Sequence, residues 1–384
     1  MTRIRTAVIG TGFMGRVHLE ALRRVEGVDV VEIAATSGDK ARAAAEGFNV
    51  LNATGDWQNV IADPSIDALH ITTPNAEHFP MAKAAFEAGK HVLCEKPLAM
   101  STAEAQQLVD LQAAKGLRGA VNHNLRYYPM VQQMRAMREA GNFGEILVVQ
   151  GTYSQDWMLY QSDWNWRVDP AVSGPSRVMA DIGSHFFDMA EHVTGLRVSE
   201  VCSDLAIFWP TRTQPAAGGE SFSGKLEGAK AGIETKIVTE DFGATLFRMG
   251  QGKIQARGAM TASQVSAGRK NGLVLEIYGT KGGASWHQER PEELWLGHRD
   301  APNQVLMKDP SLLNEKARGF ADFPGGHAEG YPDTHKQLFK RFYASIADGT
   351  LTPEYPQLAD GLRQMRILDA ELESAKSRAW VSVK

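Results

Sequence analysis

The sequence predicts a two-domain protein: a doubly wound α/β domain with a parallel sheet, followed by an α+β domain with a mostly antiparallel sheet. Three observations lead to this prediction. The length of 384 residues suits two domains. Strand-like apolar runs alternate with helical patterns over residues 4–121, which favours a parallel sheet covered on both faces. Strand-like segments follow one another without helices over residues 198–297, which favours antiparallel pairing.

The first domain is expected at residues 1–121. Its strands are expected at residues 4–9, 28–35, 68–72, 91–94 and 117–121, where short apolar runs are bounded by turn residues. Its helices are expected at residues 14–25, 39–46, 57–62, 80–88 and 102–115. Ser101 and Glu104 form a capping box for the last helix, and Gly116 ends it.

The second domain is expected at residues 122–384. Its helices are expected at residues 129–140, 184–193, 334–348 and 358–374, and its strands at 146–153, 198–208, 235–247, 253–265, 273–278 and 293–296. Residues 211–232 are rich in Gly, Ala, Ser and Pro and are expected to form a mobile surface loop. Residues 156–169 form a long Trp/Asp-rich segment, and residues 301–333 look irregular.

The composition excludes several function classes. Hydrophobic residues make up 43% of the chain and charged residues 22%, which is ordinary for a soluble globular protein. A net charge of −4 gives no electrostatic footprint for nucleic acid or an anionic membrane. The two cysteines suit a reducing cytosol, and the chain shows no signal-peptide pattern and no run of 18 apolar residues. We expect a cytoplasmic protein with neither nucleic acid nor a membrane as a partner.

A glycine motif, Gly10-x-Gly12-x-x-Gly15, follows the first strand and opens the first helix. This is the context of a dinucleotide-binding turn, in which backbone N–H groups at a helix N-terminus approach a pyrophosphate. We therefore expect Gly10, Gly12, Phe13, Met14 and Gly15 to bind a dinucleotide. The alternative is a glycine-rich turn that only packs the helix on the strand.

The end of the second strand bears on the choice of cofactor. The acidic residue that binds the adenosine ribose in NAD enzymes is expected about 20 residues after the glycine motif, and that region holds Ser37. A serine does not repel a 2′-phosphate, and Lys40 or Arg42 could pair with one, whereas Asp39 opposes it. Both basic residues could also simply solvate a helix. The cofactor is NAD or NADP, with a slight preference for NADP.

Polar motifs follow the next two strands of the predicted parallel sheet. Thr73-Pro74-Asn75 with His78 follows one strand, and Glu95-Lys96-Pro97 follows the other. Because the carboxyl ends of parallel strands meet at one edge of a sheet, these groups are expected to line the same crevice as the glycine motif. The alternative for Thr-Pro-Asn is ordinary turn chemistry.

A second polar cluster, Asp181-Ile-Gly-Ser-His185, opens a predicted helix in the second domain. His185 lies off the apolar stripe of that helix, in its first turn, where the positive helix end favours a neutral imidazole that can act as a base. Asp181 could orient this histidine or share its proton. The alternative is a capping aspartate and a surface histidine. No compact third and fourth ligand accompanies the pair, so no metal is expected.

These motifs, together with Asn124-x-Arg126-Tyr127-x-Pro129, occur in an order that resembles the Gfo/Idh/MocA oxidoreductases. The resemblance implies a Rossmann domain and an α+β domain whose large open sheet makes homo-oligomer contacts, as a dimer or tetramer. It also implies NAD(P)-dependent oxidation of a sugar or cyclitol hydroxyl, or the reverse reduction. Residues 163–167 and 324–327 resemble a subgroup related to levoglucosan dehydrogenases. Ser173-Gly-Pro-Ser176 replaces a glycine run found in many members.

The resemblance also implies residue roles. Lys96, Asp181 and His185 form the catalytic set, whereas Glu95 and the Thr-Pro-Asn turn contact the cofactor. Asn124 and Arg167 are further expected cofactor contacts. Sugar contacts are expected from side chains that offer aromatic faces or several donors, namely Arg126, Tyr127, Trp157, Trp166, Arg167 and His327.

The expected mechanism has His185 as the base and Lys96 holding the substrate oxygen. Asp181 would tune His185 or bind a neighbouring hydroxyl. Two other classes compete with this hypothesis. One is a redox-neutral glycoside hydrolase that keeps NAD bound. The other is a non-catalytic dinucleotide sensor, which the retained Lys/Asp/His set disfavours. The sequence gives neither the substrate, nor the oxidised position, nor the physiological direction.

Overall fold

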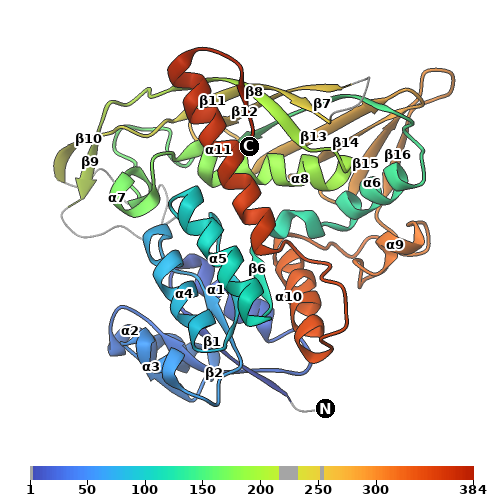
Figure 1. Cartoon of the computed structure of the whole chain (residues 1–384). Helices are drawn as coiled ribbons and strands as arrows, with labels where there is room; N and C mark the ends of the chain where they lie inside the picture. Colours follow the sequence, from blue (N-terminus) through green and yellow to red (C-terminus); the bar gives the residue numbers. More distant parts are fainter. Residues whose placement is uncertain (1–2, 216–231, 251–254) are drawn as a thin grey trace. The chain divides into compact units, whose positions relative to one another are not determined.

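The computed structural model describes residues 3–215, 232–250 and 255–384 and divides into two compact units (Figure 1). Unit 1 comprises Met1–Asn124, Ala171–Gly174 and Pro332–Met365, and unit 2 comprises Leu125–Pro170, Pro175–Tyr331 and Arg366–Lys384. Each unit is made of three separate segments of the chain, so a single boundary does not divide them. The domain boundary expected after residue 121 therefore stays a prediction. Each unit has its own hydrophobic core.

Unit 1 is built on a six-stranded parallel sheet with the order β3-β2-β1-β4-β5-β6. Its strands are β1 (Ile4–Ile9), β2 (Val28–Ala34), β3 (Asn52–Thr54), β4 (Ala68–Ile71), β5 (His91–Cys94) and β6 (Gly119–Val121). The reversal of strand order beside β1 is the place where doubly wound sheets bind ligands. Five of these strands were expected. The short β3 has no apolar run and gave no signal in the sequence.

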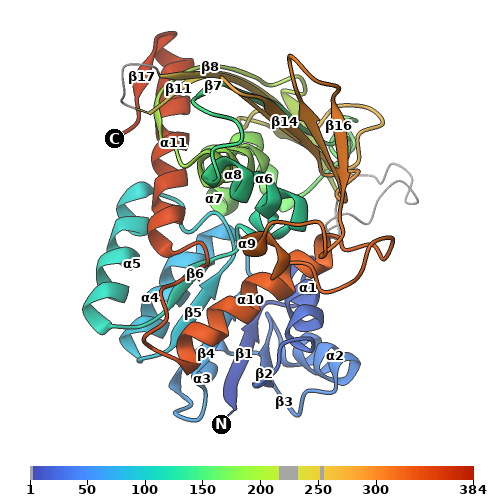
Figure 2. The same ribbon diagram turned by 90° about the vertical axis from the view of Figure 1, so that its right-hand side faces the viewer.

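Helices cover both faces of this sheet. They are α1 (Phe13–Leu22), α2 (Gly38–Phe48), α3 (Trp57–Ala62), α4 (His78–Glu87), α5 (Thr102–Lys115) and α10 (Tyr331–Ala347), with the first turns of α11 (Leu358–Ser377). Leu69 and Ile71 pack in the core with apolar side chains of α4, α5 and α11. His70, between them in the sequence, points to the other face, which α10 crosses (Figure 2).

Unit 2 is built on a nine-stranded sheet with the order β16-β15-β14-β13-β7-β12-β11-β8-β17. Its strands are β7 (Ile146–Ser154), β8 (Val198–Ala206), β11 (Phe242–Met249), β12 (Ala256–Ser263), β13 (Gly272–Gly279), β14 (Gly283–His287), β15 (Glu293–Gly297), β16 (Gln304–Met307) and β17 (Val381–Ser382). Among the strand pairs of the described residues in this sheet, only β7–β12 is parallel, so the expectation of a mostly antiparallel sheet is confirmed.

The helices α6 (Pro129–Glu139) and α8 (Ser184–Thr194) pack on one face of the large sheet (Figure 1). The rest of α11 lies on the same side, where Glu371 meets the inward-facing Thr245 of β11. Shorter elements of unit 2 are η2 (Asn124–Tyr127, from Leu125 on), η3 (Trp166–Val168), the π-helical turn η4 (Met179–Gly183) and α9 (Glu315–Arg318). The short helix α7 (Pro170–Ser173) belongs to unit 1 from Ala171 on. Within the described ranges, none of the helices combines the length and the apolar character needed to cross a bilayer.

Several expectations for the second half of the chain were wrong in detail. The single strand expected at 235–247 is two, β10 (Gly232–Lys236) and β11, because the chain turns between them at Glu240 and Asp241 to face buried arginines. Part of the loop expected at 211–232 is strand β9 (Thr211–Pro215), which pairs with β10, and the remaining loop residues lie outside the described ranges. The irregular stretch expected at 301–333 contains β16, α9 and the start of α10.

Candidate active site

The glycine turn in unit 1 lies between β1 and α1. The structural reason for a glycine differs among its three glycine positions. Gly10 has φ +107°, and a Cβ there would lie 2.8 Å from Thr72 O. A Cβ on Gly15 would lie 2.1 Å from Gly10 O. Close packing therefore explains why Gly10 and Gly15 are glycines, which agrees with the alternative that the turn only packs the helix on the strand. Gly12 has ordinary dihedrals, and a Cβ on it would meet no heavy atom of the described chain within 4 Å.

Gly12 is also the N-cap of α1, and no side chain caps the helix there. The space beside Gly12 is thus open, at a helix N-terminus, which is what close approach of a pyrophosphate requires. This turn fits a dinucleotide.

After β2, Ser37 is the N-cap of α2, where its Oγ accepts a hydrogen bond from Lys40 N at 3.3 Å. Lys40 Nζ lies 3.3 Å from Thr36 Oγ1, and Asp39 pairs with Arg42. The Asp39 and Arg42 side chains are largely exposed. Ser37 therefore has a structural role whichever cofactor binds, and the nearest acidic side chain is already paired with a base.

The turn after β4 is fixed from two sides. Thr72 Oγ1 donates to the carbonyl oxygens of Ile9 and Gly10, at 2.9 and 3.0 Å. Asn75 is buried, and its Nδ2 donates to Ser173 O at 2.8 Å. Ser173 belongs to unit 1 and to the segment that replaces the glycine run of the family that the sequence resembles. The Thr-Pro-Asn turn is thus held against the glycine turn.

His78 joins the two polar motifs of unit 1. One ring nitrogen lies 2.7 Å from Pro97 O and the other lies 2.9 Å from Thr73 O. The ring is fully buried, and this burial lowers the pKa of His78. We therefore assign this predicted cofactor residue to bracing the turns of Thr73 and Pro97 against each other.

Glu95, at the end of β5, is 5% exposed. Its Oε1 lies 3.0 Å from His18 Nε2 and accepts from Asn122 Nδ2, while Oε2 accepts from Lys96 N at 3.2 Å. Burial acts to raise the pKa of Glu95, but the hydrogen bonds and charges of these neighbours, His18 first, outweigh it and lower the pKa to about 2. Glu95 is therefore an ionised carboxylate that also accepts from the backbone N–H of Lys96. His18 and Asn122 belong to no recognised sequence motif, so the sequence did not identify them as partners of Glu95.

In unit 2, Asp181 lies inside the π-helical turn η4, and His185 is the second residue of α8. The chain is already helical through Gly183, with φ −57° and ψ −40°, so α8 continues η4 without a free start. This corrects one expectation, because His185 does not lie at a free helix N-terminus, and it argues against the alternative in which Asp181 is a helix cap. Single π turns inside helices often occur at functional sites, because they redirect side chains.

Asp181 receives two side chains from elsewhere in unit 2. Gln264 Nε2 donates to its Oδ2 at 2.8 Å, and Arg167 Nε lies 3.4 Å from its Oδ1. The Arg167 guanidinium also stacks on Trp166, 4.4 Å from the ring centre. Gln264 follows strand β12 and carries no sequence signal. The expected neighbours Trp166, Arg167 and Asp181 are therefore brought together.

His185 is 8% exposed, which excludes an ordinary surface histidine. Its ring lies 6.3 Å from that of Tyr153, at the end of β7. The Tyr153 hydroxyl donates to Asn271 Oδ1 at 2.8 Å, and burial raises the pKa of Tyr153. Gln155 donates to the same oxygen at 2.8 Å and accepts from Trp157 Nε1 at 2.8 Å. Trp157 is thus connected to the His185 neighbourhood through residues that the sequence analysis did not identify.

The remaining predicted residues have other surroundings. Arg126 forms a two-point ion pair with Asp188 of α8, and Tyr127 is buried with its ring 5.9 Å from that of Phe320. His327 is exposed on the segment after α9, and Lys308 Nζ donates to its backbone oxygen at 2.6 Å. Asn124, in unit 1, donates to Thr334 Oγ1 at 2.7 Å.

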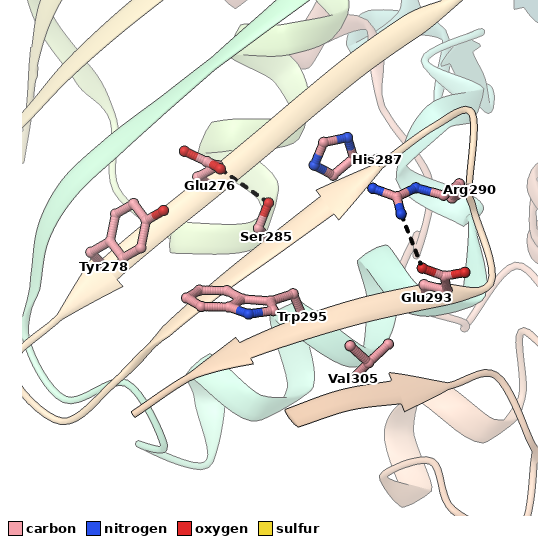
Figure 3. Close-up of a pocket in the computed structure, with 8 residues that line it drawn as sticks. All are labelled: Glu276, Tyr278, Ser285, His287, Arg290, Glu293, Trp295 and Val305. Atoms are coloured by element: carbon pink, nitrogen blue, oxygen red, sulfur yellow. Dashed lines mark hydrogen bonds and ion pairs between the residues drawn. The ribbon is translucent and has the colours of Figure 1, made fainter. Parts of the chain in front are cut away.

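A surface pocket of about 290 Å³ lies on the outer face of the large sheet, opposite α8 (Figure 3). It is lined by Glu276, Tyr278, Ser285, His287, Arg290, Glu293, Trp295 and Val305. Glu276 bonds Ser285, and Arg290 faces Glu293. The strands separate this pocket from Asp181 and His185, so it is not part of the candidate active site.

Two family models match the chain. The model described as "Oxidoreductase family, NAD-binding Rossmann fold" matches residues 4–123. The model described as "GFO/IDH/MocA C-terminal domain" matches residues 131–285. The first match covers the sheet edge with the glycine, Thr-Pro-Asn and Glu-Lys-Pro turns, and the second covers Asp181, His185 and Gln264.

Several relatives are similar over the whole chain. Levoglucosan dehydrogenase from Pseudarthrobacter phenanthrenivorans is 31% identical, covering 100% of this chain and 99% of the relative. Glucose-6-phosphate 3-dehydrogenase from Bacillus subtilis is 26% identical, covering 99% and 98%. Among solved structures, levoglucosan dehydrogenase in complex with NADH and L-sorbose has a TM-score of 0.89 at 30% identity, with both chains fully covered. An inositol dehydrogenase homologue complexed with NAD+ from Azotobacter vinelandii has a TM-score of 0.85 at 26% identity, covering 99% and 97%.

Proposed function

Because this chain belongs to the Gfo/Idh/MocA family of NAD(P)-dependent oxidoreductases, we propose that it oxidises a secondary hydroxyl of an uncharged sugar, anhydrosugar or cyclitol, or reduces the matching ketone. The observation that carries this proposal is the cluster around Asp181 in unit 2. A carboxylate, a buried imidazole and the faces of Trp157 and Trp166 are the groups that bind polyols.

The charge balance of this cluster favours a neutral substrate. Arg167 faces Asp181, Lys270 faces Asp156 and Arg126 faces Asp188. A phosphate on the sugar would have to compete with a carboxylate for each of these cations. We therefore expect free sugars to be better substrates than sugar phosphates, unlike the substrate in the name of the glucose-6-phosphate relative.

The proposed roles follow from the chemistry of each group. When bound, the dinucleotide supplies a nicotinamide that accepts the hydride. His185 takes the proton of the reacting hydroxyl, and its burial excludes water from that proton transfer. Lys96 holds the substrate oxygen and stabilises its developing negative charge. Asp181, fixed by Gln264 and Arg167, binds a neighbouring hydroxyl or orients His185.

The experiment is a screen of monosaccharides, anhydrosugars, inositols and their phosphates for absorbance change at 340 nm with NAD+ and NADP+. Lys96→Ala and His185→Ala should each keep cofactor binding and lose turnover. Lys83→Ala and His298→Ala, which change exposed residues of the same types, are matched controls. Activity of both site variants on the identified substrate would contradict the roles. Release of an aglycone without net NAD(P)H would indicate the hydrolase instead.

We further propose that the cofactor preference leans to NADP(H). Support comes from Ser37 in place of an acidic residue, and from Lys40 and Arg42 beside it. Asp39 is paired with Arg42, which reduces its repulsion of a 2′-phosphate. Fluorescence titration with NADH and NADPH tests this preference, and tighter binding of NADH would contradict it.

The outer face of the large sheet is the proposed homo-oligomer surface. It exposes Leu147, Val148, Leu246, Val305 and Met307, each more than a third exposed, beside the pocket of Figure 3. Apolar side chains spread along one sheet face are typical of a subunit interface. Light scattering of the wild type should give a dimer or tetramer, and Leu246→Lys with Val305→Lys should shift it toward the monomer. A monomeric wild type would contradict this proposal.

A further inference from the structure

A continuous chain of buried hydrogen bonds runs through unit 1, from the Glu95 carboxylate to the backbone of β4. It passes through His18 on α1, His70 on β4, Tyr343 on α10 and Thr6 on β1. All four side chains are at most 2% exposed. The sequence alone did not identify any of these four residues as functional.

The chain has a direction, which its far end determines. The carbonyl oxygen of Ala68 can only accept, so Thr6 Oγ donates to it, at 2.9 Å. Thr6 Oγ has then used its proton and accepts from the Tyr343 hydroxyl, at 2.8 Å. Tyr343 in turn has used its proton, so its oxygen accepts from His70 Nε2, at 2.9 Å. His70 therefore carries its proton on Nε2.

His70 is neutral, because burial and the neighbouring His18 hold the pKa of His70 well below its usual value. A neutral imidazole with a proton on Nε2 has a lone pair on Nδ1. His70 Nδ1 lies 2.8 Å from His18 Nδ1, so His18 must supply the proton of that hydrogen bond. Two lone pairs at this distance would otherwise repel.

The other nitrogen of His18 meets the same requirement. His18 Nε2 lies 3.0 Å from Glu95 Oε1, and an ionised carboxylate can only accept. Asn122 Nδ2 lies 3.2 Å from Nε2 and donates one of its two protons to the same Glu95 oxygen. If it gave the other proton to a lone pair on Nε2, that lone pair would also face the Glu95 carboxylate at 3.0 Å, which is repulsive. His18 therefore donates from both ring nitrogens. Three other groups face the ring: His335 and Phe339 from α10, with ring centres 5.9 and 4.9 Å away, and His70 edge-on.

We propose that His18 is a permanent imidazolium at neutral pH, held in that state by the Thr6–Tyr343–His70 chain, and that it positions the Glu95 carboxylate for cofactor binding. The positioning of Glu95 for cofactor binding rests on the proposed function, whereas the charge state of His18 does not. Because α1 begins at the glycine turn and Glu95 ends β5, this buried ion pair fixes the two sides of the dinucleotide site relative to each other. His18 is a positioning residue.

The protonation state can be measured directly in the whole protein labelled with ¹⁵N-histidine. Ring ¹⁵N shifts at pH 7.5 distinguish an imidazolium from either neutral tautomer, and His18→Gln assigns the His18 signals among the 11 histidines. We expect both His18 nitrogens to be protonated and His70 to be protonated at Nε2 only. A neutral His18 in the wild type would overturn the proposal.

Thr6→Val tests the direction of the chain with a nearly isosteric change. Without the threonine oxygen, Tyr343 can turn its proton to His70 Nε2, and His70 then donates from Nδ1 to His18. His18 should become neutral at the same pH. Ser345→Ala is the matched control, because it removes another buried hydroxyl from α10 outside the chain. An unchanged His18 imidazolium in Thr6→Val would overturn the proposed cause.

Cofactor affinity tests the positioning role independently of turnover. His18→Gln should raise the Kd of both NADH and NADPH about tenfold, as expected for losing a charge-assisted hydrogen bond. Thr6→Val should raise both by about threefold, a smaller change because the hydrogen bond to Glu95 is kept. Unchanged Kd values in a Thr6→Val protein whose His18 is neutral would overturn the role of His18. Failure to find a sugar substrate would leave these readouts unaffected and would count only against the proposed function.

Discussion

Arg126 and Asp188 form a two-point ion pair in unit 2, with Nε 2.7 Å from Oδ2 and Nη2 2.5 Å from Oδ1. The side chains are 12% and 3% exposed. Asp188 lies on α8, about one turn after His185, and Arg126 lies before α6. The pair therefore braces the helix that carries the proposed base against its neighbour, and the sugar contact that the sequence predicted for Arg126 stays a prediction.

Arg126→Met should lower the free energy of unfolding by about 3 kcal/mol, because it leaves the buried Asp188 carboxylate without its partner. Arg135→Met is the control: its side chain is 41% exposed and Glu139 keeps its pair with Lys316, so the loss should change stability by less than about 1 kcal/mol. Urea unfolding measures both. Unchanged stability in Arg126→Met with a raised KM for the sugar would instead support direct contact with the substrate.

The sequence predicted most of the fold because its strongest signals are local. Strand and helix periods, the capping box of Ser101 and the glycine caps are set by neighbouring residues, and the structure has each of them. Three of the missed strands show why others escape notice. β3 is three residues long, β9 lies in a polar stretch, and β17 consists of two residues whose pairing with β8 depends on where α11 ends.

The site was predicted less completely, for a physical reason. A motif identifies residues that are close in sequence, such as Asp181 and His185. The side chains that contact them are distant in sequence and belong to no motif. Gln264 is 83 residues from Asp181, and Tyr343 is 273 residues from His70. Neither has a neighbour pattern that marks it as polar and buried. Only the folded chain shows that these side chains satisfy each other's hydrogen bonds.

Gln264→Leu tests the support of Asp181. Without the amide donor, the Asp181 carboxylate keeps only its contact with Arg167 among the interactions described above, and its orientation should loosen. We expect kcat to fall about tenfold, the effect of a lost hydrogen bond to a charged group, with the Kd of NADH unchanged. Gln264→Glu places a second carboxylate at the same position, so its activity should fall further as pH rises and both ionise. Equal kcat in wild type and Gln264→Leu would argue against a role for Asp181 in turnover.

Lys40→Ala tests the adenosine end of the cofactor site. If Lys40 pairs with a 2′-phosphate, its removal should weaken NADPH binding about tenfold and leave NADH binding within twofold. Arg42→Ala is informative beside it, because it frees Asp39 to repel the phosphate and should act in the same direction. Parallel titrations with both nucleotides measure the ratio. Equal losses for the two nucleotides would mean that these bases serve the helix and not the cofactor.

Stability should depend on pH through Glu371, a fully buried carboxyl of α11. Burial raises the pKa of Glu371 to about 8, although Thr245 Oγ1 donates to it at 2.7 Å. The folded protein thus holds this proton between about pH 4.5 and pH 8, whereas the unfolded chain has released it. The contribution is fully present below pH 4.5 and is lost as pH rises to 8, at about 1 kcal/mol per pH unit.

Glu371→Gln keeps the shape and the neutral state but removes the titration. Thermal unfolding at pH 5 and at pH 8 should therefore show wild type losing stability relative to the variant as pH rises, by about 3 kcal/mol over this interval. Glu373→Gln, an exposed change on the same helix, should give the wild-type dependence. A parallel pH response of wild type and Glu371→Gln would show that Glu371 is ionised in the fold, and that a group outside this pair compensates its charge.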